Sequence, residues 1–260
     1  MPLTYIIKID ESFCMPLFLN EEKSVLFLHI PKTGGTTIEN WLSSTKKFKI
    51  QLFYGRPLED TTVTPQHFGY ETVSKLIGDF EESELFKFAI VRDPYERLVS
   101  EFFYRIKLKH LDLGRYPERL FSCWVVSVLK KAKRNPHVLD NHIRPQTYFT
   151  SSDVSIYKFE DGFERILDGV SENIGVTAPA TIDSHKVGTK KEVEWTDSAI
   201  AMVKEHYAAD FIEFSYNNEK NSRKISNSLI EKLYFSYYEL RKFSKDYYWK
   251  HKRNQKNRAN

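Results

Sequence analysis

The stretch that most constrains this chain is residues 25–42, VLFLHIPKTGGTTIENWL. It opens with an apolar run that is typical of a buried parallel strand, and Pro31 ends that run. Gly34 and Gly35 then allow a sharp turn and a close approach of the backbone to a ligand. Apolar residues recur at helical spacing from Thr36 onward, so a helix is predicted to begin there.

The turn in this stretch collects groups that bind anions. The free N–H groups and the positive end of the helix dipole meet the amine of Lys32 and three hydroxyls, those of Thr33, Thr36 and Thr37. A nucleotide-triphosphatase loop is not indicated, because Lys32 precedes the glycines and no GK[ST] occurs in the chain. We therefore predict an anion site, with a strand–turn–helix corner and a surface lysine as the alternative.

A second strand and helix follow at residues 86–100, FKFAIVRDPYERLVS. Asp93 suits the N-cap of the helix and Glu96 its third position, which together predict a capping box. Arg92 then stands at the carboxyl end of a strand, and Ser100 lies about two turns into the helix. Ligands bind at the carboxyl ends of strands in open α/β sheets, so this segment is a second candidate site.

The two segments resemble motifs of one enzyme family. PKTGGTT is similar to the loop that binds the 5′-phosphosulfate in sulfotransferases that use 3′-phosphoadenosine 5′-phosphosulfate (PAPS). FAIVRDPYERLVSEF resembles the 3′-phosphate motif of that family, whose Arg and Ser correspond to Arg92 and Ser100. Three later blocks resemble the carbohydrate branch related to Golgi chondroitin, HNK-1 and heparan 2-O-sulfotransferases and its bacterial members: residues 140–149, 154–167 and 203–216.

The resemblance implies a fold, an activity and a donor site. The fold is a P-loop-like three-layer α/β sandwich with a central, mostly parallel sheet flanked by helices. The activity is in-line transfer of the sulfuryl group of PAPS to an acceptor hydroxyl on a carbohydrate. Lys32 is expected to neutralise the leaving phosphate, and no metal is expected, because no Asp/Glu pair is placed for Mg²⁺. The residues expected to bind PAPS are Lys32, Thr33, Gly34, Gly35, Thr36, Thr37, Arg92 and Ser100.

The acceptor hydroxyl needs a general base, which favours a histidine. His67 in TPQHFGY occupies the position of a recurrent histidine of the family, so we predict it as the base, with helix capping as the alternative. His142 is the second candidate for the base, and its block is equally typical of an acceptor-binding or structural element. Glu160 ends an apolar strand, where a buried carboxylate is predicted to bind the acceptor or to serve the fold. His29 lies within the first strand and is expected to be a core histidine with its hydrogen bonds satisfied.

Composition and weaker patterns bound the remainder of the chain. With 260 residues, 41% of them hydrophobic, the chain fits one sizeable globular domain. No apolar run reaches the ~18 residues of a membrane span, and residues 1–19 make a poor signal peptide. We therefore expect a cytoplasmic protein, or else a trimmed luminal domain of a Golgi enzyme. Cys14 and Cys123 are expected to be buried free thiols, with a disulfide between them as the alternative. Weaker patterns predict strands at residues 5–9 and 46–54 and a helix with the buried face Val73, Leu76, Ile77 and Phe80.

The C-terminal part is predicted to be separate from the body. We expect a sulfotransferase domain over residues 1–220, then a helix and a basic tail over 221–260. Residues 250–260 carry five Lys/Arg and no acid, which leaves −1 for the rest of a chain whose net charge is +4. No specific nucleic-acid binding is therefore expected. The helix has an apolar stripe predicted to pack on the body or on a second copy, as a homo-oligomer: Ile230, Leu233, Tyr237 and Leu240.

Two other functions compete with PAPS-dependent sulfuryl transfer. A nucleotide kinase on a P-loop-like fold predicts Mg²⁺ dependence and a GK[ST] loop, and that loop is absent from the sequence. A non-catalytic protein that keeps the PAPS site predicts loss of the lysine or the base, yet Lys32 and His67 are both present.

Overall fold

The computed structural model describes most of the chain, in two compact units. One unit falls within Met1–Asp93, Asn135–Val187 and Ala209–Tyr216, and the other within Pro94–Arg134, Gly188–Ala208 and Asn217–Asn260. The predicted division at residue 220 stays a prediction. The described residues are 17–20, 23–51, 62–77, 85–111, 113, 117–179, 192–222 and 233–241.

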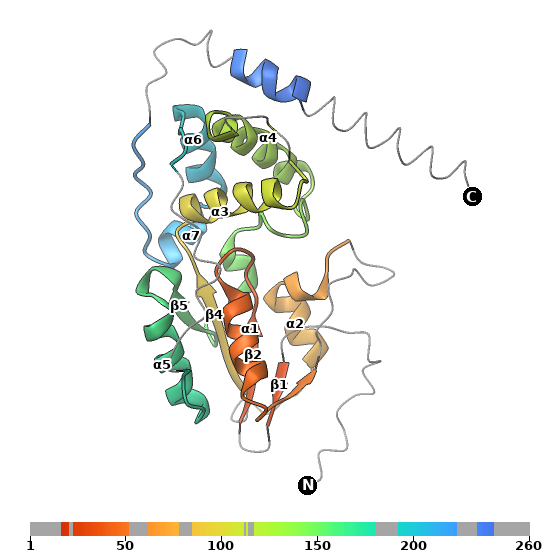
Figure 1. Cartoon of the computed structure of the whole chain (residues 1–260), viewed down its shortest axis with the longest axis vertical. Coiled ribbons are helices and arrows are strands. Elements are labelled where there is room, and N and C mark those ends of the chain that lie inside the picture. Colours follow the sequence, from red (N-terminus) through yellow and green to blue (C-terminus); the bar gives the residue numbers. More distant parts are fainter. Residues whose placement is uncertain are drawn as a thin grey trace, which may run out of the picture. The chain divides into compact units, whose positions relative to one another are not determined.

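The first unit is built on a five-stranded sheet with the order β3-β1-β2-β4-β5 (Figure 1). β1 (Leu17–Leu19) pairs antiparallel with β2 (Ser24–Leu28) and with β3 (Lys49–Gln51). β2, β4 (Leu85–Val91) and β5 (Ser155–Lys158) pair in parallel. Because β1 opposes both of its neighbours, β3 runs in the same direction as β2. Four of the five strands therefore share one direction, which confirms a mostly parallel sheet.

Helices cover both faces of this sheet. Phe27 and Phe88 on one face pack with apolar side chains of α1 (Gly35–Ser44) and α5 (Phe163–Ile174). The other face packs against Val73 of α2 (Tyr70–Ile77) and Phe149 of η4 (Gln146–Phe149). The three-layer α/β architecture is therefore confirmed.

The strong sequence patterns predicted the positions of their elements correctly, and the weak patterns predicted theirs less accurately. β2 and β4 are the two predicted buried strands, and they carry the most buried residues of the sheet. The strand predicted at 46–54 is described only as the short β3, and Phe80 and residues 5–9 lie outside the described residues. β1 was not predicted, because three apolar residues give no usable periodicity.

The second unit is helical, with an aromatic core. The ring of Trp195 lies 5.1 Å from that of Tyr95 and 4.7 Å from that of Phe121, between centroids. Phe102 adds an edge-to-face contact with Phe121 at 5.2 Å. Edge-to-face pairs of this kind hold helices together beyond the burial of area alone. The elements are α3 (Pro94–Lys107), η3 (Pro117–Leu120), α4 (Phe121–Arg134), α6 (Asp197–His206) and the helical residues 233–241.

The described part of the apolar stripe of the C-terminal helix does not pack on the body, which was one of its two predicted partners. Leu233, Tyr237 and Leu240 are exposed, whereas Tyr238 is buried, and Ile230 lies outside the described residues. The helix therefore contacts its unit through a different side from the one that the spacing indicated, and a contact with a second copy stays a prediction.

Within the described residues, no helix is both long enough and apolar enough to cross a membrane. Cys123 is buried and forms no disulfide within the described residues, and Cys14 lies outside them.

Candidate active site

The two glycines of the anion loop are each packed against an aromatic ring. Gly34 has φ 87°, and a Cβ there would lie 2.4 Å from Cζ of Phe163. A Cβ on Gly35 would lie 2.8 Å from Cε1 of His29. Both contacts are shorter than real Cβ atoms show, so a side chain at either position would force the neighbouring ring to shift. The loop is thereby drawn tightly against the sheet and α5.

The start of α1 retains the capacity to bind an anion. Gly34 provides no side-chain cap, and the first turn contains no acidic residue. Thr36 is exposed and Thr37 half-buried in this turn, while Lys32 is half-buried with φ 71°. Thr33 differs from the expectation, because its buried hydroxyl donates to the carbonyl of Ile30 at 2.8 Å. That hydroxyl serves the loop itself.

Arg92 reaches the anion loop from the end of β4. Its Nη1 donates to the carbonyl of Lys32 at 3.3 Å, and its guanidinium lies 4.3 Å from the ring centroid of Phe159. The two segments that resembled donor-binding motifs are thus brought together at Lys32 and Arg92. Ser100 is half-exposed in α3, within the second unit, and its part in the site stays a prediction.

A buried amide and a buried carboxylate hold the backbone of Arg92, and sequence reasoning missed both roles. The side chain of Gln146 accepts from the N–H of Arg92 and donates to its carbonyl, each at 2.8 Å. Asp210, from α7 (Ala208–Glu213), accepts from the N–H groups of Gln146 at 2.8 Å and Thr147 at 3.1 Å. Asp210 and Gln146 are fully buried, so they hold the end of the strand from within the protein interior.

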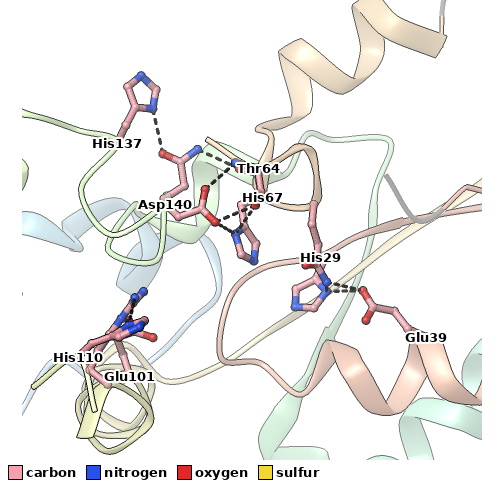
Figure 2. A network of polar contacts seen from close by, with 11 residues as sticks. His29, Glu39, Thr64, His67, Glu101, His110, His137 and Asp140 are labelled. Carbon is pink, nitrogen blue, oxygen red and sulfur yellow. Dashed lines mark hydrogen bonds and ion pairs between the residues drawn. The ribbon is translucent and has the colours of Figure 1, made fainter. Parts of the chain in front are cut away.

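His67, the predicted base, is a nearly buried histidine at the end of η1 (Pro65–His67). Its Nδ1 lies 2.8 Å from Oδ2 of Asp140 and 3.1 Å from Oγ1 of Thr64 (Figure 2). Its ring makes edge-to-face contacts with His142 at 4.7 Å and with His29 at 5.6 Å. The predicted base and one predicted acceptor-binding residue, His142, are therefore neighbours.

The carboxylate of Asp140 is held by three donors. Thr64 donates its N–H to Oδ1 at 2.6 Å and its hydroxyl to Oδ2 at 2.7 Å, and His67 occupies the same Oδ2. Partial burial by itself raises the pKa of this carboxyl. The hydrogen bond and charge of His67 and the two donors of Thr64 outweigh that effect and lower its pKa to about 2. Asp140 is therefore ionised at neutral pH.

His29 is a satisfied histidine at the back of the anion loop, as expected. Its Nδ1 lies 2.5 Å from Oε1 of Glu39 (Figure 2). Nε2 of Gln66 lies 3.1 Å from each of these two atoms. Burial of Glu39 opposes ionisation, but the hydrogen bonds and positive potential of His29 and its neighbours lower the pKa of this carboxyl overall. The pair supports the loop.

Glu160 is exposed, which corrects the expectation of a buried carboxylate at a strand end. Its Oε1 accepts from the N–H of Asp93, and its Oε2 accepts from the hydroxyl of Tyr216, each at 2.8 Å. Glu160 thus takes the N–H that the capping box would assign to Glu96. Burial and the negative charge of Glu160 raise the pKa of Tyr216 well above its usual range. These contacts favour the role in the fold over acceptor binding.

One group in the described part of the chain could hold a metal ion. The ligand atoms of His67, Asp140 and His142 all lie within 4.8 Å of one another. The hydrogen bonds favour a different arrangement, because both oxygens of Asp140 already accept from Thr64 or His67. The cluster is best described as an Asp–His pair beside a second histidine.

One of three comparisons with known proteins gives a match. A family model described as the sulfotransferase family matches residues 15–240. The searches of curated proteins and of solved structures found no significant match.

Proposed function

Since this chain belongs to the sulfotransferase family, we propose that it transfers the sulfuryl group of PAPS to an acceptor hydroxyl on a carbohydrate. The observation that carries the proposal is the meeting of Arg92, from the end of β4, with Lys32 of the anion loop. In this proposal the guanidinium of Arg92 and the amine of Lys32 act with the uncapped start of α1 to bind a doubly phosphorylated nucleotide. PAPS supplies, when bound, an activated sulfuryl group on a phosphate leaving group.

The proposal gives each part of the donor site a task. Lys32 and the N–H groups at the start of α1 hold the 5′ side, and Arg92 with Ser100 holds the 3′-phosphate. Thr33 contributes through its backbone, because its hydroxyl donates to Ile30. The residues proposed to bind PAPS are Lys32, Thr33, Gly34, Gly35, Thr36, Thr37, Arg92 and Ser100.

Two residues are proposed to act on the reacting groups. His67 accepts the hydroxyl proton at Nε2 as the bond between the acceptor oxygen and sulfur forms. Lys32 offsets the negative charge that the leaving phosphate gains as its bond to sulfur breaks. His142, beside His67, is proposed to orient the acceptor.

Calorimetric titration with 3′-phosphoadenosine 5′-phosphate (PAP) tests the donor site, with ADP and ATP–Mg²⁺ as comparators. Arg92→Ala is expected to weaken PAP binding by about 10- to 100-fold, because a charged hydrogen bond to phosphate is lost. Arg144→Ala is the matched control. Arg144 also stacks on an aromatic ring, that of Tyr148 at 4.2 Å, and its loss should change PAP affinity less than about 3-fold. Preference for ATP–Mg²⁺ over PAP would overturn the proposal.

The acceptor class has its own assay. Transfer of labelled sulfate from PAPS to desulfated chondroitin and heparan is expected, and to simple phenols it is not. Labelling of phenols alone would contradict the carbohydrate acceptor while leaving sulfuryl transfer intact.

A further inference from the structure

We infer that Asp140, presented by a strained left-handed turn, is the positioning residue of His67 and sets which ring nitrogen can accept a proton. The catalytic meaning of this inference rests on the proposed function, in which His67 is the base. The placement itself rests on contacts within the first unit.

The hydrogen bonds around His67 select one tautomer. Thr64 has a single hydroxyl proton, and it is donated to Oδ2 of Asp140. Nδ1 of His67 therefore faces two oxygens that accept, Oδ2 of Asp140 at 2.8 Å and Oγ1 of Thr64 at 3.1 Å. A lone pair on Nδ1 would be repelled by both, so Nδ1 carries the proton. The lone pair of the neutral ring then lies on Nε2.

The carboxylate has little freedom to turn away. Thr64 holds Oδ1 through its N–H and Oδ2 through its hydroxyl. The next residue, Asn141, donates from Nδ2 to the backbone carbonyl of His67 at 2.9 Å, and its own Oδ1 lies 3.0 Å from Nδ1 of His137. His67 is thus held at its ring by Asp140 and at its backbone by Asn141.

The turn that carries these two residues is strained. Leu139, Asp140 and Asn141 have φ of 54°, 60° and 60°, three consecutive non-glycine residues in the left-handed region. This conformation costs an ordinary L-residue roughly 1–2 kcal/mol, and somewhat less for Asp and Asn. Such strain persists only where surrounding contacts determine it, and it gathers at functional sites. The contacts of this turn include those of Asp140 with Thr64 and His67 and that of Asn141 with the carbonyl of His67.

The arrangement suits a base that becomes charged. When Nε2 accepts the hydroxyl proton, the ring becomes an imidazolium with Nδ1–H still directed at the carboxylate. Asp140 remains ionised, because the pKa of its carboxyl is about 2, and its negative charge stabilises the cation. Asp140 thus orients the ring and favours its protonated form without receiving the proton.

Nitrogen NMR of histidine-labelled protein tests the tautomer without any turnover. The signals of His67 are identified by their loss in His67→Gln. We expect Nδ1 of His67 to be protonated and Nε2 unprotonated in the wild type, and we expect Asp140→Asn to show a mixture of tautomers. Asp153→Asn is the matched control: Asp153 accepts from Tyr70 at 2.6 Å and from Lys87 at 2.5 Å, so this change should leave His67 unaltered.

A kinetic measurement distinguishes a positioning role of Asp140 from a merely structural one. Hydrolysis of PAPS to PAP and sulfate, with water as acceptor, is expected to slow about 100-fold in Asp140→Asn, whereas PAP affinity should change less than about 3-fold. Should Asp140→Asn fail to fold, Thr64→Val removes one anchor of the carboxylate and is expected to shift the tautomers partway.

The outcomes are distinct for the two proposals. An unprotonated Nδ1 in the wild type, or an unchanged tautomer in Asp140→Asn, would overturn the inference. A loss of PAP affinity in Asp140→Asn as large as the loss of hydrolysis rate would also overturn it. A wild type that binds no PAP would overturn the proposed sulfotransferase activity, and the NMR result would still decide whether Asp140 positions His67.

Discussion

Gly34 meets two demands at once in the anion loop. It adopts φ of 87°, and it leaves space for the ring of Phe163 on α5. The shape of the loop and the packing of α5 on the sheet are therefore coupled at one residue. A side chain here would disturb the fold and the proposed donor site together.

A pair of alanine substitutions separates strain from crowding. Gly175 is also left-handed, with φ 64°, but a Cβ there would meet nothing within 4 Å. Gly175→Ala should lower the free energy of unfolding by about 1 kcal/mol, through backbone strain alone. Gly34→Ala should cost roughly 1–3 kcal/mol more, because the Phe163 ring must shift. Urea unfolding measures both, and equal losses would show that the ring contact imposes no constraint.

At the scale of elements, the left-handed turn at residues 139–141 predicts an unusual order of stability for two substitutions at Leu139. Glycine is normally about 0.5–1 kcal/mol less favourable than alanine in regular structure. With φ of 54° at Leu139, the order should reverse. Leu139→Gly is expected to be about 1 kcal/mol more stable than Leu139→Ala.

Comparison of these two variants reports mainly on the backbone, because both lose the leucine side chain beyond Cβ and they differ by that one carbon. Thermal or urea unfolding gives the difference in the free energy of unfolding. If Leu139→Ala proves the more stable of the two, the turn is not strained as described.

Local patterns predicted the elements that frame the site. The apolar run and glycine turn indicated β2 and the start of α1, and the strand before Arg92 is β4. These segments carry their own signal, because burial on both faces demands continuous apolar residues. β1 carries little local signal of its own, since it is short and its position is set by pairing with β2 and β3.

No local sequence pattern could predict which residues hold His67 and Arg92 in place. His67 and Asp140 are 73 residues apart in the sequence, and no periodicity links them. Gln146 and Asp210 are likewise joined only by the fold, although both lie in blocks that resembled the family. Sequence motifs thus indicated that these blocks matter, and the structure shows that they brace Arg92 and His67.

At the scale of the whole molecule, Asp140 links the site to stability against acid. Its pKa is about 2 when folded, against an ordinary value of 3.8. Between these values the unfolded chain binds a proton that the folded state does not, so acid favours unfolding. The stabilising contribution is present above about pH 4 and is lost as the pH falls toward 2. After allowance for solvent screening of this partly exposed group, it is on the order of 1 kcal/mol.

The matched comparison is with Glu205, an exposed carboxyl whose pKa is lowered by its surface ion pair with Lys133. Asp140→Asn should flatten the fall in unfolding free energy between pH 4 and 2 at low and at high salt. Glu205→Gln should do so only at low salt, because exposed pairs are screened. Urea titrations across this range, at two ionic strengths, measure both effects. If salt removed the contribution of Asp140 as fully as that of Glu205, the Asp–His pair would be open to solvent and too loosely held to direct a proton.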